Sequence, residues 1–471
     1  MKKHRYPPNI ATYIIMLSGM SKIDDWADRS RQLRHCHNIY DSYREYMEFC
    51  KEKGLRDELA NSPIVLYAKI LSKAGLYQNF FDLLFSVEET GPLAPNEYFY
   101  STCFNALLRR ESLENPGVLS VREQNASDAK LIWRRMEIDV RRNNTKIDSS
   151  VLVSALEVFS HGRPSDLQFG LDLVQRYIGS LPPEVTTIEG NVDINQYLFS
   201  TILDLCLRAQ NYDLCTRYGK QIIDWWKAAE TRVQGLDLTH AEIYRILVGH
   251  YHLAKGGSRD ELPKALQLYR WAASQGEDLC PTTNEFNTML AICEFCNDWT
   301  AACEVLEIST GISVNKFRNG NINGEKTDDA LSTASSSSIT VRARPLTHIA
   351  RTALASHQIT IVQQCLLIMT HFDINRIYAG FRSSPDIVFY FQRELADAII
   401  KMVDFTSNVS SPAERKQWEI LKANSQRIVN SKRKPIVPRT EDLFSTLQPK
   451  ESVPLEKLQQ GIDFESATRY S

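Results

Sequence analysis

Amphipathic helical patterns occur in pairs along most of this chain, and this pairing constrains its fold more than any other feature. The clearest pair lies between Pro281 and Ile308, where the turn Asn297-Asp298 separates two stretches with apolar residues at helical spacing. Neither helix can bury its apolar stripe alone, so neighbouring pairs must stack. The first stripe contains Phe286, Met289, Leu290 and Cys293, and the second contains Ala301, Ala302, Val305 and Leu306.

The same pattern recurs from the first residues to about residue 310, whereas strand patterns are hard to place anywhere. It predicts about seven helix pairs, more than the roughly three that a stable stack needs. The fold class is therefore predicted as all-α, an α-solenoid of helix-turn-helix repeats with a helical C-terminal extension. We expect first helices at 9–22, 62–73, 96–110, 148–161, 196–210, 240–255 and 283–297, and second helices at, for example, 126–142, 167–178, 214–228 and 261–275.

Composition divides the chain into four parts. Residues 1–310 form the predicted repeat array, and residues 311–344, which are polar and rich in Gly and Ser, form a predicted disordered linker. Helical patterns resume in a C-terminal region at 345–430, and residues 431–471 form a predicted basic, flexible tail. Because nothing in 311–344 offsets the entropy cost of ordering, we expect this linker to be dispensable for folding.

Charge and motif content argue against several classes of protein. The formal net charge of −2 argues against a protein that coats nucleic acid nonspecifically, because such binding needs an excess of Lys and Arg. No apolar run approaches the ~20 residues that cross a bilayer, so we expect no membrane insertion. No nucleotide-binding or hydrolytic motif is present, so we expect neither enzyme activity nor a cofactor. Cys293 and Cys296 lie on the apolar stripe of a predicted helix, which favours buried structural cysteines over a metal site.

Several predicted first helices begin in the same way, with Pro before Asn or Thr and then an aromatic residue followed by a short polar one. Such starts are Pro95-Asn96 before Tyr100-Ser101, Pro281-Thr282 before Phe286-Asn287, and the related segment Phe199-Ser200. They resemble the repeats of the pentatricopeptide-repeat (PPR) family over roughly two thirds of the chain. Family repeats are about 35 residues long, whereas most units here are longer because they contain insertions.

The resemblance implies an RNA-binding protein with single-stranded RNA as its partner and no catalytic site. It is greatest with fungal mitochondrial PPR proteins that act on small-subunit ribosomal RNA or on intron splicing. It therefore implies an adaptor in the mitochondrial matrix for maturation of rRNA or pre-mRNA, through rRNA 5′-end processing, small-subunit assembly or splicing. The N-terminus, MKKHRYPPNIATYIIML, contains no clear presequence.

Two alternatives stay open. A TPR-like scaffold for protein–protein interactions uses the same type of solenoid to bind peptides. Residues 199–225 are also similar to the PPR subunit of the animal mitochondrial small ribosomal subunit, so a structural ribosomal role is the other alternative.

In PPR proteins, the residue directly after the early aromatic of the first helix meets the edge of an unstacked base. The resemblance places base-reading residues at Ser101, Ser200, Arg245 and Asn287, with Asp148 as a second reader paired with Ser101. Ile14 occupies the same position but is apolar, so we expect it to read nothing. The alternative is that these short polar side chains merely face water.

Positive charge is concentrated in two segments, which are candidate phosphate-binding sites. One is a predicted second helix with Arg134, Arg135, Arg141 and Arg142. The other runs from Arg415 to Arg439, has Glu419 as its single acidic residue, and includes Lys432, Arg433 and Lys434. A solvated helix face is the alternative interpretation, above all for the first segment, where acidic residues lie between the arginines.

Overall fold

The computed structural model consists of α-helices and two short 3-10 helices in the part of the chain that it describes. No strand occurs in that part, so the prediction of an all-α fold is confirmed. The described residues are 8–114, 119–143, 147–179, 192, 194–228, 238–276, 279–317, 339, 341–379 and 384–438.

Residue contacts divide the chain into two compact units. The first unit comprises Met1–Asn211 and Lys220–Asp237, and the second comprises Tyr212–Gly219 and Leu238–Ser471. The helix α10 (Tyr212–Ala228) is therefore shared between them.

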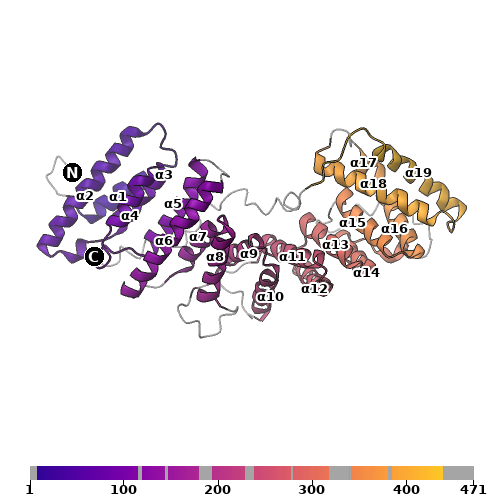
Figure 1. Cartoon of the computed structure of the whole chain (residues 1–471), viewed down its shortest axis with the longest axis horizontal. Coiled ribbons are helices and arrows are strands. Elements are labelled where there is room, and N and C mark those ends of the chain that lie inside the picture. Colours follow the sequence, from indigo (N-terminus) through magenta and orange to yellow (C-terminus); the bar gives the residue numbers. More distant parts are fainter. Residues whose placement is uncertain are drawn as a thin grey trace. The chain divides into compact units, whose positions relative to one another are not determined.

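In the first unit, alternate helices pack side by side. Its helices are α1 (Ile10–Ser21), α2 (Ser30–Lys53), α3 (Ser62–Lys73), α4 (Tyr77–Ser86), α5 (Glu97–Glu114), α6 (Leu119–Asn143), α7 (Ser149–Ser160), α8 (Pro164–Tyr177) and α9 (Gln196–Arg208), with a 3-10 turn at Arg56–Glu58. α1 contacts α3, α3 contacts α5, α5 contacts α7 and α7 contacts α9, while α1, α3, α5 and α7 each also pack on the helix that follows (Figure 1). This is the packing of stacked helix-turn-helix repeats.

The second unit continues the same pattern through the C-terminal region. Its helices are α11 (His240–Lys255), α12 (Glu261–Ser274), α13 (Thr283–Cys296), α14 (Trp299–Thr310), α15 (Ala343–Ala355), α16 (Ile359–His371), α17 (Ile374–Tyr378), α18 (Asp386–Thr406) and α19 (Pro412–Val429). α11 contacts α13, α13 contacts α15 and α15 contacts α18. The first part of the predicted C-terminal helical region is thus a helix pair, α15 with α16, which adds a further repeat to the stack. The turn inside this pair contains His357 with φ 52°.

Polar residues at the helix starts explain why most predicted boundaries agree with the structure to within two residues. The side chains of Asn9, Asp148 and Asn195 each accept a hydrogen bond from a backbone N–H in the first turn of α1, α7 and α9. Thr239 and Thr282 begin α11 and α13 as capping boxes, with a Glu three residues into each helix. α6 is the main exception, because it begins at Leu119 rather than near residue 126.

Residues 311–317 belong to the folded second unit, which corrects the prediction that the linker begins at 311. A 3-10 turn at Val314–Phe317 packs on α16. The Val314 side chain is buried, its N–H donates to Glu307 Oε1 at 2.5 Å, and its carbonyl oxygen accepts from Gln364 Nε2 at 3.3 Å. Residues 318–338 and 340, which make up most of the predicted linker, lie outside the described residues.

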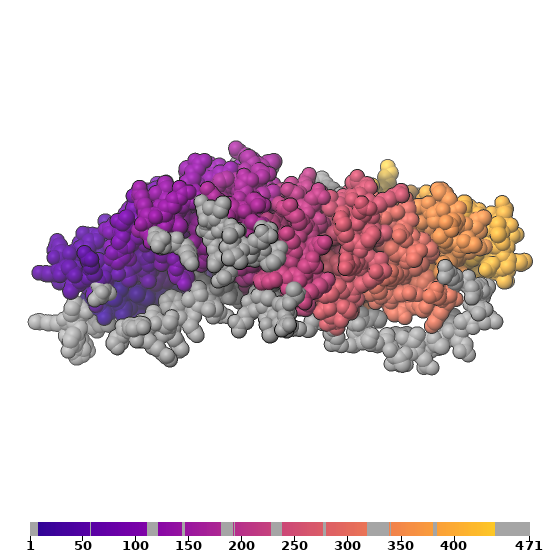
Figure 2. Space-filling model, turned by 90° about the horizontal axis from the view of Figure 1, so that it is seen from below, coloured from indigo at the N-terminus to yellow at the C-terminus, as the bar shows by residue number. Residues whose placement is uncertain are grey.

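Contacts within each unit are local along the sequence. Every substantial helix–helix contact joins elements no more than three positions apart in the order of helices. In the space-filling view the colours accordingly follow one another in chain order along each unit (Figure 2). Among the described helices, none is both long and apolar enough to cross a membrane.

Candidate nucleic-acid interface

The predicted base-reading positions lie where neighbouring first helices meet. All except Asp148 follow an aromatic side chain that packs in the core, since Tyr100, Phe199, Tyr244 and Phe286 are at most 6% exposed. At Ser101, the residue after the aromatic approaches the first helix of the adjacent repeat, because its hydroxyl lies near two serines of α7. How far it reaches solvent therefore depends on how closely the adjacent helix packs.

Ser101 lies at the junction between α5 and α7 and is half-buried. Its hydroxyl is 3.3 Å from the hydroxyls of both Ser150 and Ser154 on α7, and it accepts a weaker hydrogen bond from Asn105 at 3.4 Å. Ser200, at the corresponding position of α9, is also half-buried. Among the predicted base readers, these two serines and Asp148 are half-buried rather than buried.

Asp148 caps the N-terminus of α7. Its Oδ1 accepts a hydrogen bond from the Val151 N–H at 2.8 Å, and burial, as the largest cause, raises the pKa of its carboxyl above the usual value. Asp148 lies in the same first turn as Ser150, which contacts Ser101, so the structure brings the predicted pair into one region. The capping bond accounts for Asp148 without a ligand.

Arg245 and Asn287 are buried, which corrects the expectation that they lie on an open surface. They are only 8% and 6% exposed. Asn287 is on α13, which is covered on one side by α11 and on the other by α15, and its Oδ1 has no hydrogen-bond partner among the described residues. The helical repeat pattern predicts which positions read bases, but it does not show how tightly the neighbouring helices close over them.

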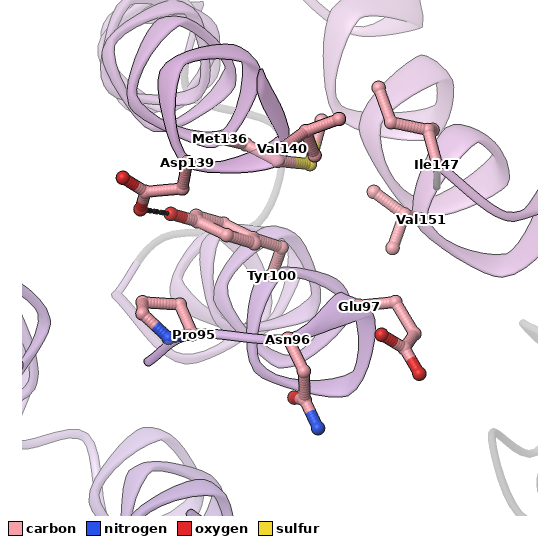
Figure 3. Close-up of a pocket in the computed structure, with 9 residues that line it drawn as sticks. All are labelled: Pro95, Asn96, Glu97, Tyr100, Met136, Asp139, Val140, Ile147 and Val151. Carbon is pink, nitrogen blue, oxygen red and sulfur yellow. Dashed lines mark hydrogen bonds between the residues drawn. The ribbon is translucent and has the colours of Figure 1, made fainter. Parts of the chain in front are cut away.

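A small recess lies beside Tyr100, lined by residues of α5, α6 and the start of α7 (Figure 3). Tyr100 donates a hydrogen bond to Asp139, and Arg135 Nε lies 3.7 Å from the same carboxylate. The recess has room for about one water molecule, so it is too small for a nucleotide base. It is lined by Pro95, Asn96, Glu97, Tyr100, Met136, Asp139, Val140, Ile147 and Val151.

The four predicted phosphate-binding arginines of α6 have different environments. Arg135 donates to the backbone carbonyls of Leu84 and Val87 and so ties α6 to the end of α4, which corrects its assignment to phosphate binding. Arg142 is exposed but pairs with Glu89. Arg134 and Arg141 are exposed and make no ion pair or hydrogen bond with any other described residue.

The three predicted phosphate-binding residues near residue 433 also have different environments. The Arg433 guanidinium donates to the Ser384 carbonyl oxygen at 2.6 Å and to Asp386 at 2.7 Å, and it lies 4.4 Å from the centroid of the Phe389 ring. It therefore holds residues 431–438 on α18, which corrects the prediction that the tail is flexible from residue 431. Lys432 and Lys434, on either side, are exposed; residues 439–471 lie outside the described part of the chain.

Exposed cations on α19 extend the pair Lys432 and Lys434. Arg415, Lys416 and Arg427 are exposed, and none of the three forms an ion pair with a described carboxylate. We call these five residues the α19 cationic surface. The basic composition of 415–439 indicated the region, but only the structure separates its exposed cations from the paired Lys422 and Arg433.

A partly buried charge cluster between α13 and α15, with His348 as its buried member, was not predicted. His348 Nδ1 is 2.5 Å from Glu294 Oε2, and Arg351 lies 3.5 Å from the same carboxylate while also pairing with Glu394 of α18. Burial lowers the pKa of His348, with the contact to Glu294 opposing it. Glu294 and His348 are far apart in sequence, on either side of the predicted linker, so no local pattern could reveal the contact.

No group of three or more His, Cys, Asp or Glu side chains is arranged to hold a metal ion in the described ranges. Cys293 is fully buried, and burial raises the pKa of its thiol well above the usual value. A buried thiol of this kind is a poor ligand and a poor nucleophile.

Comparison with known proteins gives a distant structural similarity. No family model matches the sequence, and no protein of curated function matches it. The solved structures that align with the chain include the pentatricopeptide repeat protein PPR10 in complex with an 18-nt psaJ RNA element, and a cysteine-to-serine variant of PPR10 with the same RNA. In both, the identity is 12%, the TM-score is 0.41, and the alignment covers 99% of this chain. The chain spans 57% of the length of the protein that it matches, and it is the helix packing described above that establishes the all-α repeat fold.

Proposed function

We propose that this protein is a PPR-type RNA-binding adaptor that holds single-stranded RNA and has no catalytic site of its own. The observation that carries the proposal is the α19 cationic surface, five exposed Lys and Arg side chains without a described carboxylate partner in a chain of net charge −2. Cations left unpaired in this way are available to neutralise phosphates. Ser101 and Ser200, the half-buried register residues, supply the hydroxyl groups for contacts to bases.

The finer role follows from the PPR-like helix starts in the sequence. We propose a place in the mitochondrial matrix and a part in maturation of mitochondrial RNA, by rRNA 5′-end processing and small-subunit assembly or by intron splicing. A permanent place in the mitochondrial small ribosomal subunit would use the same RNA contacts.

A TPR-like protein scaffold is the second candidate, and the burial of Arg245 and Asn287 favours it. These two residues were expected to read bases but are buried, so fewer base-reading positions are accessible to RNA than the number of repeats implies. A scaffold needs no polar reader at that register.

The test uses the full chain and fluorescently labelled single-stranded RNA. Replacing Lys416, Lys432 and Lys434 together by Gln should weaken binding to all RNAs alike and flatten the slope of log K against log salt by about 0.7 for each phosphate that is no longer neutralised. The control is Lys255→Gln with Arg259→Gln, two exposed cations on and after α11. Unchanged RNA binding in the triple variant, or no RNA binding by the parent, would count against the proposal and favour the scaffold.

Crosslinking in cells, followed by sequencing of the recovered RNA, tests the finer role. The expected outcome is enrichment of mitochondrial rRNA or of intron-containing mitochondrial transcripts. Recovery of cytoplasmic RNA alone would contradict the proposed location.

A further inference from the structure

The solvent-facing side of α6 has a regular pattern that the RNA contacts proposed for the α19 cationic surface do not use. Among the α6 side chains whose exposure is described, the exposed ones follow one another at intervals of three and four residues, with Arg142 as the one addition. Such alternating intervals place side chains on a single stripe along a helix. We call it the α6 stripe, and its members are Gln124, Ser127, Leu131, Arg134, Ile138 and Arg141.

The α6 stripe exposes large apolar side chains. Leu131 and Ile138, seven residues apart, are 57% and 47% exposed. Phe85 on α4, which is 66% exposed, lies beside α6, because its ring centroid is 5.9 Å from the guanidinium of Arg135. Single exposed apolar residues are ordinary, but two on one stripe at a heptad spacing match the way one helix packs on another.

The charges on the α6 stripe are all positive. Arg134 and Arg141 alternate with the apolar residues, and neither has a hydrogen bond or ion pair with another described residue. The nearby carboxylates of α6 are already engaged: Asp128 pairs with Arg110, Glu137 with Arg176, and Asp139 with Tyr100 and Arg135. The stripe therefore lacks a local counter-charge.

We propose that the α6 stripe docks an amphipathic helix of a partner protein, one whose apolar residues repeat every three or four positions beside Asp or Glu residues. Its apolar side chains would cover Leu131 and Ile138, and its carboxylates would pair with Arg134 and Arg141. A second copy of this chain fits poorly, because two α6 stripes would bring like-charged arginines together. RNA fits poorly too, because the aliphatic Leu131 and Ile138 offer no ring on which a base can stack. This inference does not depend on the proposed RNA-binding function.

The probe is a synthetic, fluorescently labelled helical peptide of about four heptads, with Leu at the two core positions and Glu beside them. A matched peptide has Lys in place of every Glu. Fluorescence anisotropy with the full chain should give a Kd in the micromolar range for the Glu peptide and at least ~10-fold weaker binding for the Lys peptide. Absence of Glu-peptide binding up to about 100 μM, or equal binding of both peptides, would overturn the proposal.

Two double variants locate the contact. Leu131→Ser with Ile138→Ser, and Arg134→Glu with Arg141→Glu, should each weaken binding of the Glu peptide by at least ~10-fold. Lys255→Glu with Arg259→Glu is the matched charge control and should leave it unchanged. Because all six side chains are exposed, circular dichroism and thermal unfolding of the variants should match those of the parent.

Two further measurements distinguish a partner helix from RNA and from a second copy of the chain as the occupant of the α6 stripe. If Arg134→Glu with Arg141→Glu lowers RNA affinity as much as the α19 triple variant does, the stripe binds phosphates and the docking proposal fails. If sedimentation shows a dimer that Leu131→Ser with Ile138→Ser converts to a monomer, the occupant is a second copy and the proposal also fails. Failure of RNA binding alone leaves the peptide result, and hence this inference, intact.

Discussion

The junction between α5 and α7 in the first unit and the junction between α13 and α15 in the second unit join neighbouring first helices by different chemistry. In the first, the Ser101 hydroxyl meets those of Ser150 and Ser154 at 3.3 Å. In the second, the Glu294 carboxylate meets His348 at 2.5 Å and Arg351 at 3.5 Å. Neighbouring first helices can therefore be joined either by neutral hydroxyls or by ionisable groups, and we expect the ionisable junction to respond more strongly to charge removal and to pH.

Removing the carboxylate should have the largest effect. Glu294→Leu leaves the buried His348 without its carboxylate partner, while Arg351 keeps Glu394, so we expect the free energy of unfolding of the second unit to fall by about 2–3 kcal/mol. Ser101→Ala in the first unit should cost less than about 1 kcal/mol. Urea unfolding, with hydrogen exchange resolved by helix, measures both.

Glu294→Gln is the control, because it keeps a hydrogen-bonding side chain of the same shape. The free energy of unfolding of Glu294→Gln should lie between those of the parent and of Glu294→Leu. Equal destabilisation by Glu294→Leu and Ser101→Ala would show that the two junctions do not differ as the contacts indicate.

The two units should respond to acid in opposite directions. Burial, reinforced by Asp204, raises the pKa of Glu157 on α7 to about 7, whereas burial, reinforced by Lys255, lowers the pKa of His252 on α11 to about 4. The folded state binds the Glu157 proton more tightly than the unfolded state does, where the pKa has its ordinary value of 4.5. The protonated side chain therefore contributes fully to the free energy of unfolding below pH 4.5, and this contribution is lost as pH rises through about 7. His252, with an ordinary value of 6.5, has the opposite effect, since stability falls as pH decreases from 6.5 towards about 4.

Hydrogen exchange at about pH 7.5 and about pH 5.5 tests this contrast, with an expected change of roughly 1 kcal/mol in each unit. The first unit should gain protection and the second should lose it, and the lowered pKa of His348 acts in the same direction as that of His252. Glu157→Gln should reduce the pH response of the first unit only, and His252→Gln should reduce that of the second unit only, with the contribution of His348 remaining. A uniform loss of protection in both units at the lower pH would contradict the assignment.

The smallest expected effect comes from Asn287 at the second junction. Asn287→Leu removes a buried carbonyl oxygen that has no hydrogen-bond partner among the described residues, so we expect a gain of up to about 1 kcal/mol in stability. Affinity for RNA should stay the same, because the side chain is 6% exposed. Thermal unfolding and RNA titration measure the two quantities, and loss of RNA affinity would restore Asn287 as a base reader.

Helix positions could be predicted because the signals are local. The predicted range 240–255 coincides with α11, where Thr239 and Glu242 form a capping box. Accessibility was harder to predict, because it depends on neighbouring repeats. Arg134 and Arg135 are adjacent in sequence, yet one faces solvent and the other binds carbonyl oxygens of Leu84 and Val87, about 50 residues away in the chain.

The local character of the contacts also bears on how the chain acquires its structure during synthesis. Since each substantial contact joins elements at most three positions apart, a helix pair finds its partner as soon as the next pair has left the ribosome. No early segment has to wait, with its apolar stripe exposed, for residues made at the other end of the chain. We therefore expect progressive co-translational folding from the N-terminus, in which a ribosome stalled after α7 already displays a protease-resistant α1 to α5.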